Sequence, residues 1–316
     1  MSDTPILTIA IPTYNRPHKL NRLLQILKEE IIRLNLISSV RISVSDNSEN
    51  SESTYAFENI DFGNIDVEYF RQVSNVGFDR NLTTLYNKCT TQYIWFISDD
   101  DIPLPDGIRK IVESLINQKP DLLLFSFSQP PGSKIRTFDY KTNLHLIDTP
   151  VDAISVVIKY PKISIYILKK IEFTNIQKKF IEDCFGDGWI FIILSLSVLA
   201  NVLQPKVAII SEILATADED YSHIWVPTPF LHMYKIAYHP YIKQFMPQLE
   251  EKLRIQGYID CIKFSWALRR GVLTLDDKDG LDQFIKNINW NFFILIPRPK
   301  LFLQLVLLKF NLVKIL

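Results

Sequence analysis

The chain has 316 residues, 47% of them hydrophobic and 22% charged, so it can bury a sizeable core and is not expected to be disordered. Its 35 basic and 35 acidic residues balance, so no overall field favours nucleic acid and no such partner is expected. The three cysteines lie far apart, which excludes a C-x-x-C metal site and fits a reducing cytoplasm.

Strand and helix patterns alternate through the first half of the chain. Residues 6–11 form an apolar, partly β-branched run that predicts a buried strand, and Pro17 opens a helical pattern. Helical patterns separate four further short apolar runs, which predict strands over residues 40–44, 67–70, 93–97 and 121–125. This alternation predicts βαβ units and a mostly parallel sheet flanked by helices.

The second half is less regular. Residues 129–150 have the composition of a loop or a hairpin. Helical patterns extend over about 188–201 and about 228–290. We find no dinucleotide-binding G-x-G-x-x-G segment and no P-loop, which argues against an oxidoreductase or an NTPase.

Polar side chains follow three of the predicted strands. Residues 13–16 follow the first strand, Asp46 follows the second, and the acid cluster Asp99-Asp100-Asp101 follows the fourth. Ligands of an open parallel sheet bind outside the carboxyl ends of its strands. The pattern therefore predicts that these residues line one rim of the sheet.

The acid cluster has the composition of a site for a hard divalent cation. Mg²⁺ and Mn²⁺ prefer oxygen ligands and typically take one or two carboxylates together with substrate phosphates. Held by Asp99 and Asp101, such an ion would offset the charge of a leaving nucleoside diphosphate. The alternative is a solvated acidic turn before a helix that starts near Pro105.

Two further polar segments each have two interpretations. Asp46 is suited to accept hydrogen bonds from a nucleobase or a ribose, but Asp-Asn-Ser is also good turn chemistry. The segment Asn75-Val76-Gly77 has the same ambiguity, because Gly77 permits either a positive φ or a close approach by a ligand.

Taken together, these segments resemble the GT-A glycosyltransferases of family 2, in the family's order and at its spacing. The similar segments are the opening strand and loop, the second strand with its base-contacting aspartate, the N-x-G…N segment and the D-x-D strand: residues 7–16, 42–48, 75–81 and 93–101. Within the family, the sequences of these segments most resemble the bacterial O-antigen and polysaccharide transferases of the abequosyltransferase-like group.

This resemblance implies a nucleotide-sugar donor, a Mn²⁺ or Mg²⁺ cofactor, and inverting transfer of a hexosyl or deoxyhexosyl group. The acceptor would be a hydroxyl of a lipid-linked or free glycan in the synthesis of a bacterial surface polysaccharide such as the O-antigen of lipopolysaccharide. The implied donor contacts are Pro12, Thr13, Tyr14, Arg16, Asp46, Asn75, Asp99 and Asp100, and the implied metal ligands are Asp99 and Asp101.

The general base of the family often belongs to a Glu-Asp pair at the start of a helix in the second half. The counterpart here is Asp187, before the helical pattern that begins near residue 188. Gly186 stands in the place of the glutamate, and Glu182-Asp183 lies just upstream as an alternative. Asp187 also fits a purely structural role as an acidic residue at a helix N-terminus.

A second acidic cluster, residues 218–220, precedes His223. Some GT-A enzymes use a late histidine as an extra metal ligand, and His223 or His232 is a candidate. A solvated loop is the alternative explanation of this cluster.

The resemblance implies a Rossmann-like GT-A catalytic domain over residues 1–225, with a nucleotide-sugar half over about 1–127 and an acceptor half over about 128–225. A C-terminal helical region is expected over 226–316. Residues 290–316 contain no acid but several basic residues, and an amphipathic helix from about Lys300 predicts peripheral contact with the anionic cytoplasmic face of the inner membrane. Docking of this helix on the protein's own core or on a second subunit is the alternative.

The first residues lack the segments of a signal peptide, and we see no uncharged apolar run of about 18 residues, so a cytoplasmic location is expected. Two other functions stay open. One is a sugar-phosphate nucleotidyltransferase. Such enzymes resemble one another in a glycine-rich G-x-G-x-R-x-x-P loop after the first strand, but residues 12–16 of this chain lack that pattern. A catalytically silent nucleotide-sugar-binding subunit is the other.

Overall fold

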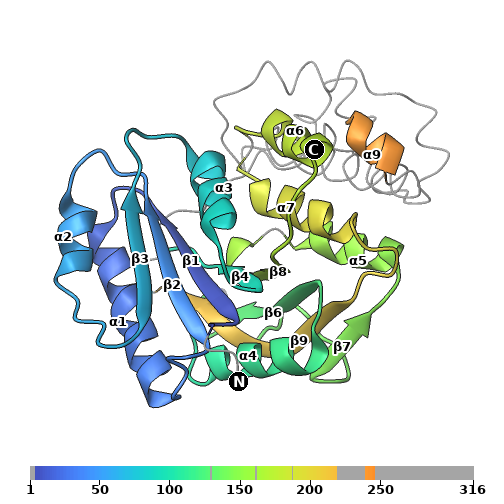
Figure 1. Ribbon diagram of the computed structural model, residues 1–316. Helices are drawn as coiled ribbons and strands as arrows, with labels where there is room; N and C mark the ends of the chain where they lie inside the picture. Colours follow the sequence, from blue (N-terminus) through green and yellow to red (C-terminus); the bar gives the residue numbers. More distant parts are fainter. Residues whose placement is uncertain (1–3, 129, 161, 187, 219–238, 246–316) are drawn as a thin grey trace, which may run out of the picture. The chain divides into compact units, whose positions relative to one another are not determined.

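The computed structural model describes residues 4–128, 130–160, 162–186, 188–218 and 239–245 (Figure 1). The chain divides into two units, residues 1–224 and 225–316. The central sheet belongs to the first unit, and the helix α9 (Pro240–Phe245) belongs to the second. The predictions for Asp187, for His223 and for the basic tail fall outside the described residues.

Nine strands in the described part of the chain form one mixed sheet, in the order β3-β2-β1-β4-β8-β6-β9-β5, with β7 paired to β9. The strands are β1 (Leu7–Thr13), β2 (Val40–Asp46), β3 (Asp66–Arg71), β4 (Tyr93–Phe96), β5 (Asp101–Pro103), β6 (Leu122–Ser128), β7 (Leu144–Ile147), β8 (Tyr166–Lys169) and β9 (Val207–Ala217). All seven residues of β1 are buried, as expected for a strand covered on both faces.

Helices cover both faces of this sheet. In Figure 1, α3 and α7 lie on one face, with α5 beside α7, and α1 and α4 lie on the other. Every residue of α7 is buried, because this helix is apolar all round. The helices of the first unit are α1 (Pro17–Arg33), α2 (Glu52–Glu58), α3 (Phe78–Lys88), α4 (Gly107–Gln118), α5 (Pro150–Lys159), α6 (Asn175–Asp183) and α7 (Ile190–Leu199), with the short 3-10 turn η1 (Ile163–Ile165).

The predicted α/β fold with a central sheet flanked by helices is confirmed, and the first four predicted strands pair in parallel as expected. The rest of the sheet is mixed. The short strand β8 is inserted antiparallel between β4 and β6, and β9 runs parallel to β6 but antiparallel to β5 and β7. The parallel order of the βαβ units therefore stops at β4.

Candidate active site

The carboxyl ends of β2, β1 and β4 meet at one edge of the sheet. Thr13 and Asp46 are register partners at the ends of β1 and β2. Asp99 follows β4, which is the other neighbour of β1. The structure therefore brings together the polar residues that the sequence places on one rim.

Thr13 and Arg16 bind the first carboxylate of the acid cluster. The Thr13 hydroxyl donates to Asp99 Oδ2 at 2.7 Å. The Arg16 guanidinium donates to Asp99 Oδ1 at 3.0 Å and to Asp100 Oδ2 at 3.2 Å. Burial raises the pKa of Asp99 to about 6, although Arg16 and Thr13 act in the opposite direction. The loop after β1 and the loop after β4 thus form one charged cluster.

Asp101, at the start of β5, faces a different cation. The Lys162 ammonium donates to Asp101 Oδ1 at 2.9 Å, and the Ser164 hydroxyl donates to its other oxygen. Burial raises the pKa of Asp101 to about 6 despite the neighbouring Lys162. The sequence analysis did not name Lys162 or Ser164, because no local pattern marks a lysine whose partner lies 61 residues away.

Asp100 is the accessible member of the acid cluster. Its side chain is 29% exposed, against 3% for Asp99 and 1% for Asp101. Burial acts to raise the pKa of Asp100, but the hydrogen bond from the Ser98 hydroxyl and the charges of Lys162 and Arg16 outweigh it, so this pKa is lowered. Asp100 therefore presents a carboxylate charge toward solvent at neutral pH.

The predicted nucleoside contact Asp46 forms the turn that the sequence left as an alternative. Its Oδ1 accepts the backbone N–H of Ser48 at 2.8 Å, and its Oδ2 accepts the Tyr69 hydroxyl at 2.5 Å. Burial and the bond to Asp46 raise the pKa of Tyr69, so this phenol stays a donor. Asp46 is fully buried, and its contact with a donor nucleotide stays a prediction.

Asn75 lies beside the end of β2 because of a residue that the sequence analysis missed. The Asn47 side chain donates to Asn75 Oδ1 at 2.6 Å and accepts the backbone N–H of Val76 at 2.8 Å. The Asn75 oxygen also accepts the N–H of Gly77, whose φ of 82° lies in the region that favours glycine. These bonds join the loop after β2 to the start of α3.

The other predicted donor contacts differ in exposure. Tyr14 is 41% exposed, and its hydroxyl donates to Glu49 at 3.1 Å, so its ring lies at the surface of the rim. Pro12 is buried within β1, opposite Ser45. Tyr14 is therefore available to a ligand, while Pro12 contributes to the strand.

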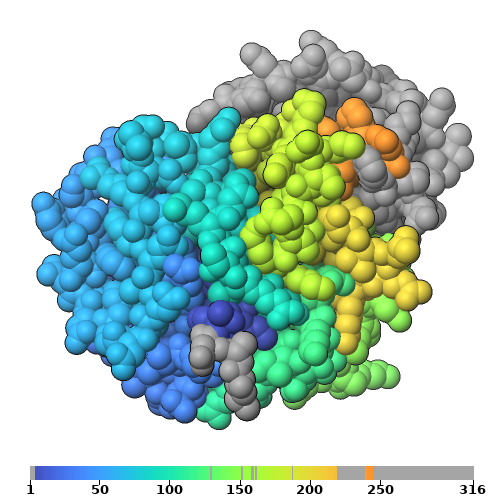
Figure 2. All heavy atoms as spheres, in the orientation of Figure 1, coloured from blue at the N-terminus to red at the C-terminus, as the bar shows by residue number. Residues whose placement is uncertain are grey.

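The segment around Asp187 is fixed on both sides by a buried carboxylate. Oδ2 of Asp79, in the first turn of α3, accepts the backbone N–H of Gly186 at 2.8 Å and of Gly188 at 3.0 Å. The Arg80 guanidinium also lies 4.7 Å from the centre of the Phe185 ring. In Figure 2 the atoms of α3 lie against those of the region that includes α6 on the face shown. The flanks of the candidate base are thus attached to the helix that follows Asn75.

The donor set of the acid cluster suits a hard cation. Asp99, Asp100 and Asp101 offer only carboxylate oxygens, and their three charges face the two cations Arg16 and Lys162. Burial raises the pKa of both Asp99 and Asp101, and a cation bound beside them would act against that shift. Among the described residues, however, no group of three or more His, Cys, Asp or Glu side chains is arranged to hold a metal ion.

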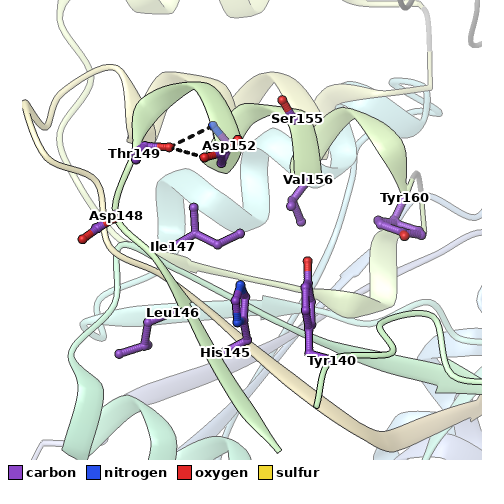
Figure 3. Close-up of a pocket in the computed structure, with 10 residues that line it drawn as sticks. All are labelled: Tyr140, His145, Leu146, Ile147, Asp148, Thr149, Asp152, Ser155, Val156 and Tyr160. Carbon is purple, nitrogen blue, oxygen red and sulfur yellow. Dashed lines mark hydrogen bonds between the residues drawn. The ribbon is translucent and has the colours of Figure 1, made fainter. Parts of the chain in front are cut away.

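A hollow of about 380 Å³ lies away from the acid cluster, between β7 and α5 (Figure 3). The rings of Tyr140 and His145 stack on its wall with centroids 4.0 Å apart, and the Thr149 hydroxyl donates to Asp152 at 2.7 Å. β7 pairs with the first residues of β9, whereas Asp101 pairs with the last. This hollow is therefore separate from the acid cluster and contains none of the predicted site residues.

Residues 8–192, more than half of the chain, match the family model for Glycosyl transferase family 2. The chain belongs to glycosyl transferase family 2. This confirms the family predicted from the strand-end motifs, while the abequosyltransferase-like group stays a prediction. No curated protein sequence matches this glycosyltransferase. In the described part of the chain, no helix has the length and apolar character needed to cross a membrane.

Solved structures with the same fold include TarS from S. aureus. The TarS 1–349 complex with UDP has a TM-score of 0.66 at 14% identity, covering 96% of this chain and 88% of that chain. The complex with UDP-GlcNAc has a TM-score of 0.64 at 13% identity, covering 92% and 83%. This family 2 glycosyltransferase spans only 50% of a longer TarS chain. At these identities the similarity shows the GT-A fold alone.

Proposed function

We propose that this family 2 enzyme is a metal-dependent, inverting glycosyltransferase that uses a nucleotide-sugar donor. The observation that carries the proposal is the joining of the acid cluster to the rim of β1 and β2 through Thr13, Arg16 and Asp99. The similar TarS structures were determined with UDP and with UDP-GlcNAc, which supports a nucleotide-sugar donor here as well.

The donor would lie along the rim, from β2 toward β4. Its nucleoside would contact Asp46, Asn75 and the exposed ring of Tyr14, because these residues surround the end of β2. Its phosphates would lie over the acid cluster, near the guanidinium of Arg16. Arginine forms planar, charge-assisted hydrogen bonds with phosphate oxygens, so Arg16 would position the leaving group.

Asp99 and Asp101 would hold Mn²⁺ or Mg²⁺, and His223 is proposed as a further ligand from outside the described residues. Bound there, the ion would supply Lewis-acid stabilisation of the negative charge on the leaving diphosphate. The Lys162 ammonium beside Asp101 acts to lower the pKa of this carboxyl, against the larger effect of burial.

Asp187 is the proposed general base. The acceptor hydroxyl oxygen forms a bond to the anomeric carbon while the bond from that carbon to the diphosphate oxygen breaks. The hydroxyl proton passes to the Asp187 carboxylate, and the electron pair of the broken bond leaves with the diphosphate. A single displacement of this kind inverts the anomeric centre. The anchoring of Gly186 and Gly188 by Asp79 supports this role.

The proposed acceptor is a hydroxyl of a lipid-linked or free glycan in bacterial surface polysaccharide synthesis, with a hexose or deoxyhexose as the transferred sugar. The amphipathic basic pattern of residues 300–316 supports peripheral binding at the cytoplasmic face of the inner membrane. Residues 128–225 would form the acceptor half of the catalytic domain, and residues 226–316 a helical region.

A thermal-shift screen of nucleotide sugars with Mn²⁺ tests donor binding. A ligand that binds only the folded state at 100 times its Kd adds about 2.7 kcal/mol to the free energy of unfolding. We expect one donor, or a few that share a base, to raise the Tm in the presence of Mn²⁺. If no nucleotide sugar changes the Tm of the full chain, the proposal is wrong.

A further inference from the structure

A second hollow, of about 170 Å³, adjoins the acid cluster on the side away from the nucleoside contacts. It is lined by Phe127, Ile135, Arg136, Thr137 and Lys162. The Lys162 ammonium in its wall is the same group that donates to Asp101 at 2.9 Å. This hollow therefore begins at the residue next to the proposed metal site.

The order of the strands places this hollow relative to the donor. Asp46 ends β2, the acid cluster follows β4, and Phe127 lies near the end of β6, in the strand order β2-β1-β4-β8-β6. β4 and β8 separate β6 from β1 and β2, and the other neighbour of β6, β9, pairs with Asp101 of the acid cluster. The hollow therefore lies beside the acid cluster and away from β1 and β2, whose ends carry the proposed nucleoside contacts.

The walls of the hollow are cationic and apolar. Lys162 lies 4.4 Å from the centre of the Phe127 ring, and this cation–π contact directs the ammonium along the wall. An ammonium has three donor protons, so Lys162 can bind Asp101 and an anion in the hollow together. The Arg136 side chain is exposed and makes no hydrogen bond or ion pair with another described residue.

The backbone that carries Arg136 is fixed to the sheet. The next residue, Thr137, accepts the backbone N–H of Phe127 at 3.1 Å and donates to the Phe127 carbonyl at 3.3 Å. The N–H of the buried Phe138 donates to Ser126 Oγ at 2.9 Å. Arg136 therefore projects from a fixed position at the end of β6.

We propose that this hollow is an anion subsite that binds a phosphate or carboxylate group of the acceptor, held between Arg136 and Lys162. The inference rests on the proposed glycosyl transfer and narrows the acceptor to an anionic glycan or glycan phosphate. Arginine at such a site supplies paired, charge-assisted hydrogen bonds to an oxyanion, and lysine supplies a compact charge.

The test measures binding of inorganic phosphate by the line width of its ³¹P signal, in EDTA so that no metal recruits phosphate to the acid cluster. The full chain is compared with Arg136→Gln and with Lys134→Gln, which removes the same charge from an exposed position two residues away. We expect phosphate to bind about tenfold more weakly to the Arg136→Gln protein, a loss of about 1.4 kcal/mol, and equally well to the Lys134→Gln protein.

A second arm separates the acceptor's anion from the donor's phosphates. Phosphate binding is measured again in the same EDTA buffer, with a nucleoside diphosphate at a concentration that gives its full rise in Tm in that buffer. Retained binding supports an acceptor subsite, whereas displacement by the nucleotide overturns it. Equal binding by the wild-type and Arg136→Gln proteins also overturns it. A nucleotide-induced rise in Tm in both proteins shows that each is folded and binds the donor, so failure of the subsite is distinguishable from failure of the proposed function.

Discussion

The carboxylate of Asp79 accepts the backbone N–H of Gly186 at 2.8 Å, across 107 residues of sequence. The same oxygen accepts the N–H of Gly188 at 3.0 Å, so both neighbours of residue 187 are attached to the first turn of α3. Gly186 and Gly188 have φ values of 96° and 72°, which L side chains rarely adopt. A replacement at either glycine would strain this turn. The positive φ of residue 186 thus explains why Gly186 stands where the family often has a glutamate.

Replacement of the proposed base tests its role directly. We expect Asp187→Asn to lower kcat by about 10²–10⁴-fold, which is the usual contribution of general-base catalysis. Donor affinity, followed by the nucleotide-induced rise in Tm, should stay at the wild-type value because the base acts on the acceptor. Glu182→Gln and Asp183→Asn are the matched controls. Loss of kcat in either control, with normal activity in Asp187→Asn, would show that the base is upstream.

Asp79 should act through residue 187 as a positioning residue. We expect Asp79→Ala to lower kcat, because it removes the acceptor of two backbone N–H groups beside the base. The double variant with Asp187→Asn should be no slower than Asp187→Asn alone, because residues that act as a unit are not additive. If the losses of kcat in the two single variants multiply in the double variant, Asp79 affects turnover by another route.

The buried carboxylate of Asp99 predicts a specific pH dependence of stability. Burial raises its pKa from 3.8 to about 6 in the folded protein, so the folded state binds a proton more tightly than the unfolded state. The stability that this proton contributes is full below about pH 4 and is lost as the pH rises through about 6. Asp99→Asn is neutral at every pH and should avoid this loss.

The measurement is the Tm by calorimetry in EDTA at pH values from 4.5 to 7.5. The Tm of Asp99→Asn minus that of the wild-type protein should become more positive as the pH rises. Asp139→Asn, at an exposed position, should show no such trend. A difference that does not change with pH would contradict the raised pKa of Asp99.

The basic tail predicts binding to anionic membranes. The full chain should co-sediment with liposomes that contain anionic lipid, and a variant with Lys300, Lys309 and Lys314 changed to Gln should bind more weakly. Added salt should reduce binding only in part, because apolar residues contribute too. The matched control changes the exposed lysines 134, 141 and 178 instead. Equal binding by the tail variant and the wild-type chain would mean that the tail has another role.

The parallel half of the sheet follows from the sequence because its signals are local. In each βαβ unit, such as the one from β1 to β2, about 30 residues contain an apolar run, a polar strand end and a helical pattern. The insertion of β8 between β4 and β6 depends instead on pairing between residues distant in the chain. The four-residue strand β8 is no shorter than β4, which the sequence did predict, so the difference lies in its partners: no local pattern marks its antiparallel pairing with β4 and β6.

In the candidate site, too, some residues are predictable from local sequence and others only from the fold. The acid cluster and Asp46 are recognisable because they follow predicted strands directly. Their partners Lys162, Ser164 and Asp79 are brought by the tertiary fold, and a lone lysine or a helix aspartate carries no signal of its partner. The sequence could therefore place the acids of the rim but not the residues that hold them.

The most direct test of the central claim is release of nucleoside diphosphate from a panel of nucleotide sugars by the purified full chain with Mn²⁺. We predict turnover of at least one donor, its loss in EDTA, and its recovery when Mn²⁺ is restored in excess. The Asp101→Asn protein, folded by its Tm, should lose most of this turnover. Absence of turnover by the wild-type chain with every donor, or full activity in Asp101→Asn or in EDTA, would contradict the account.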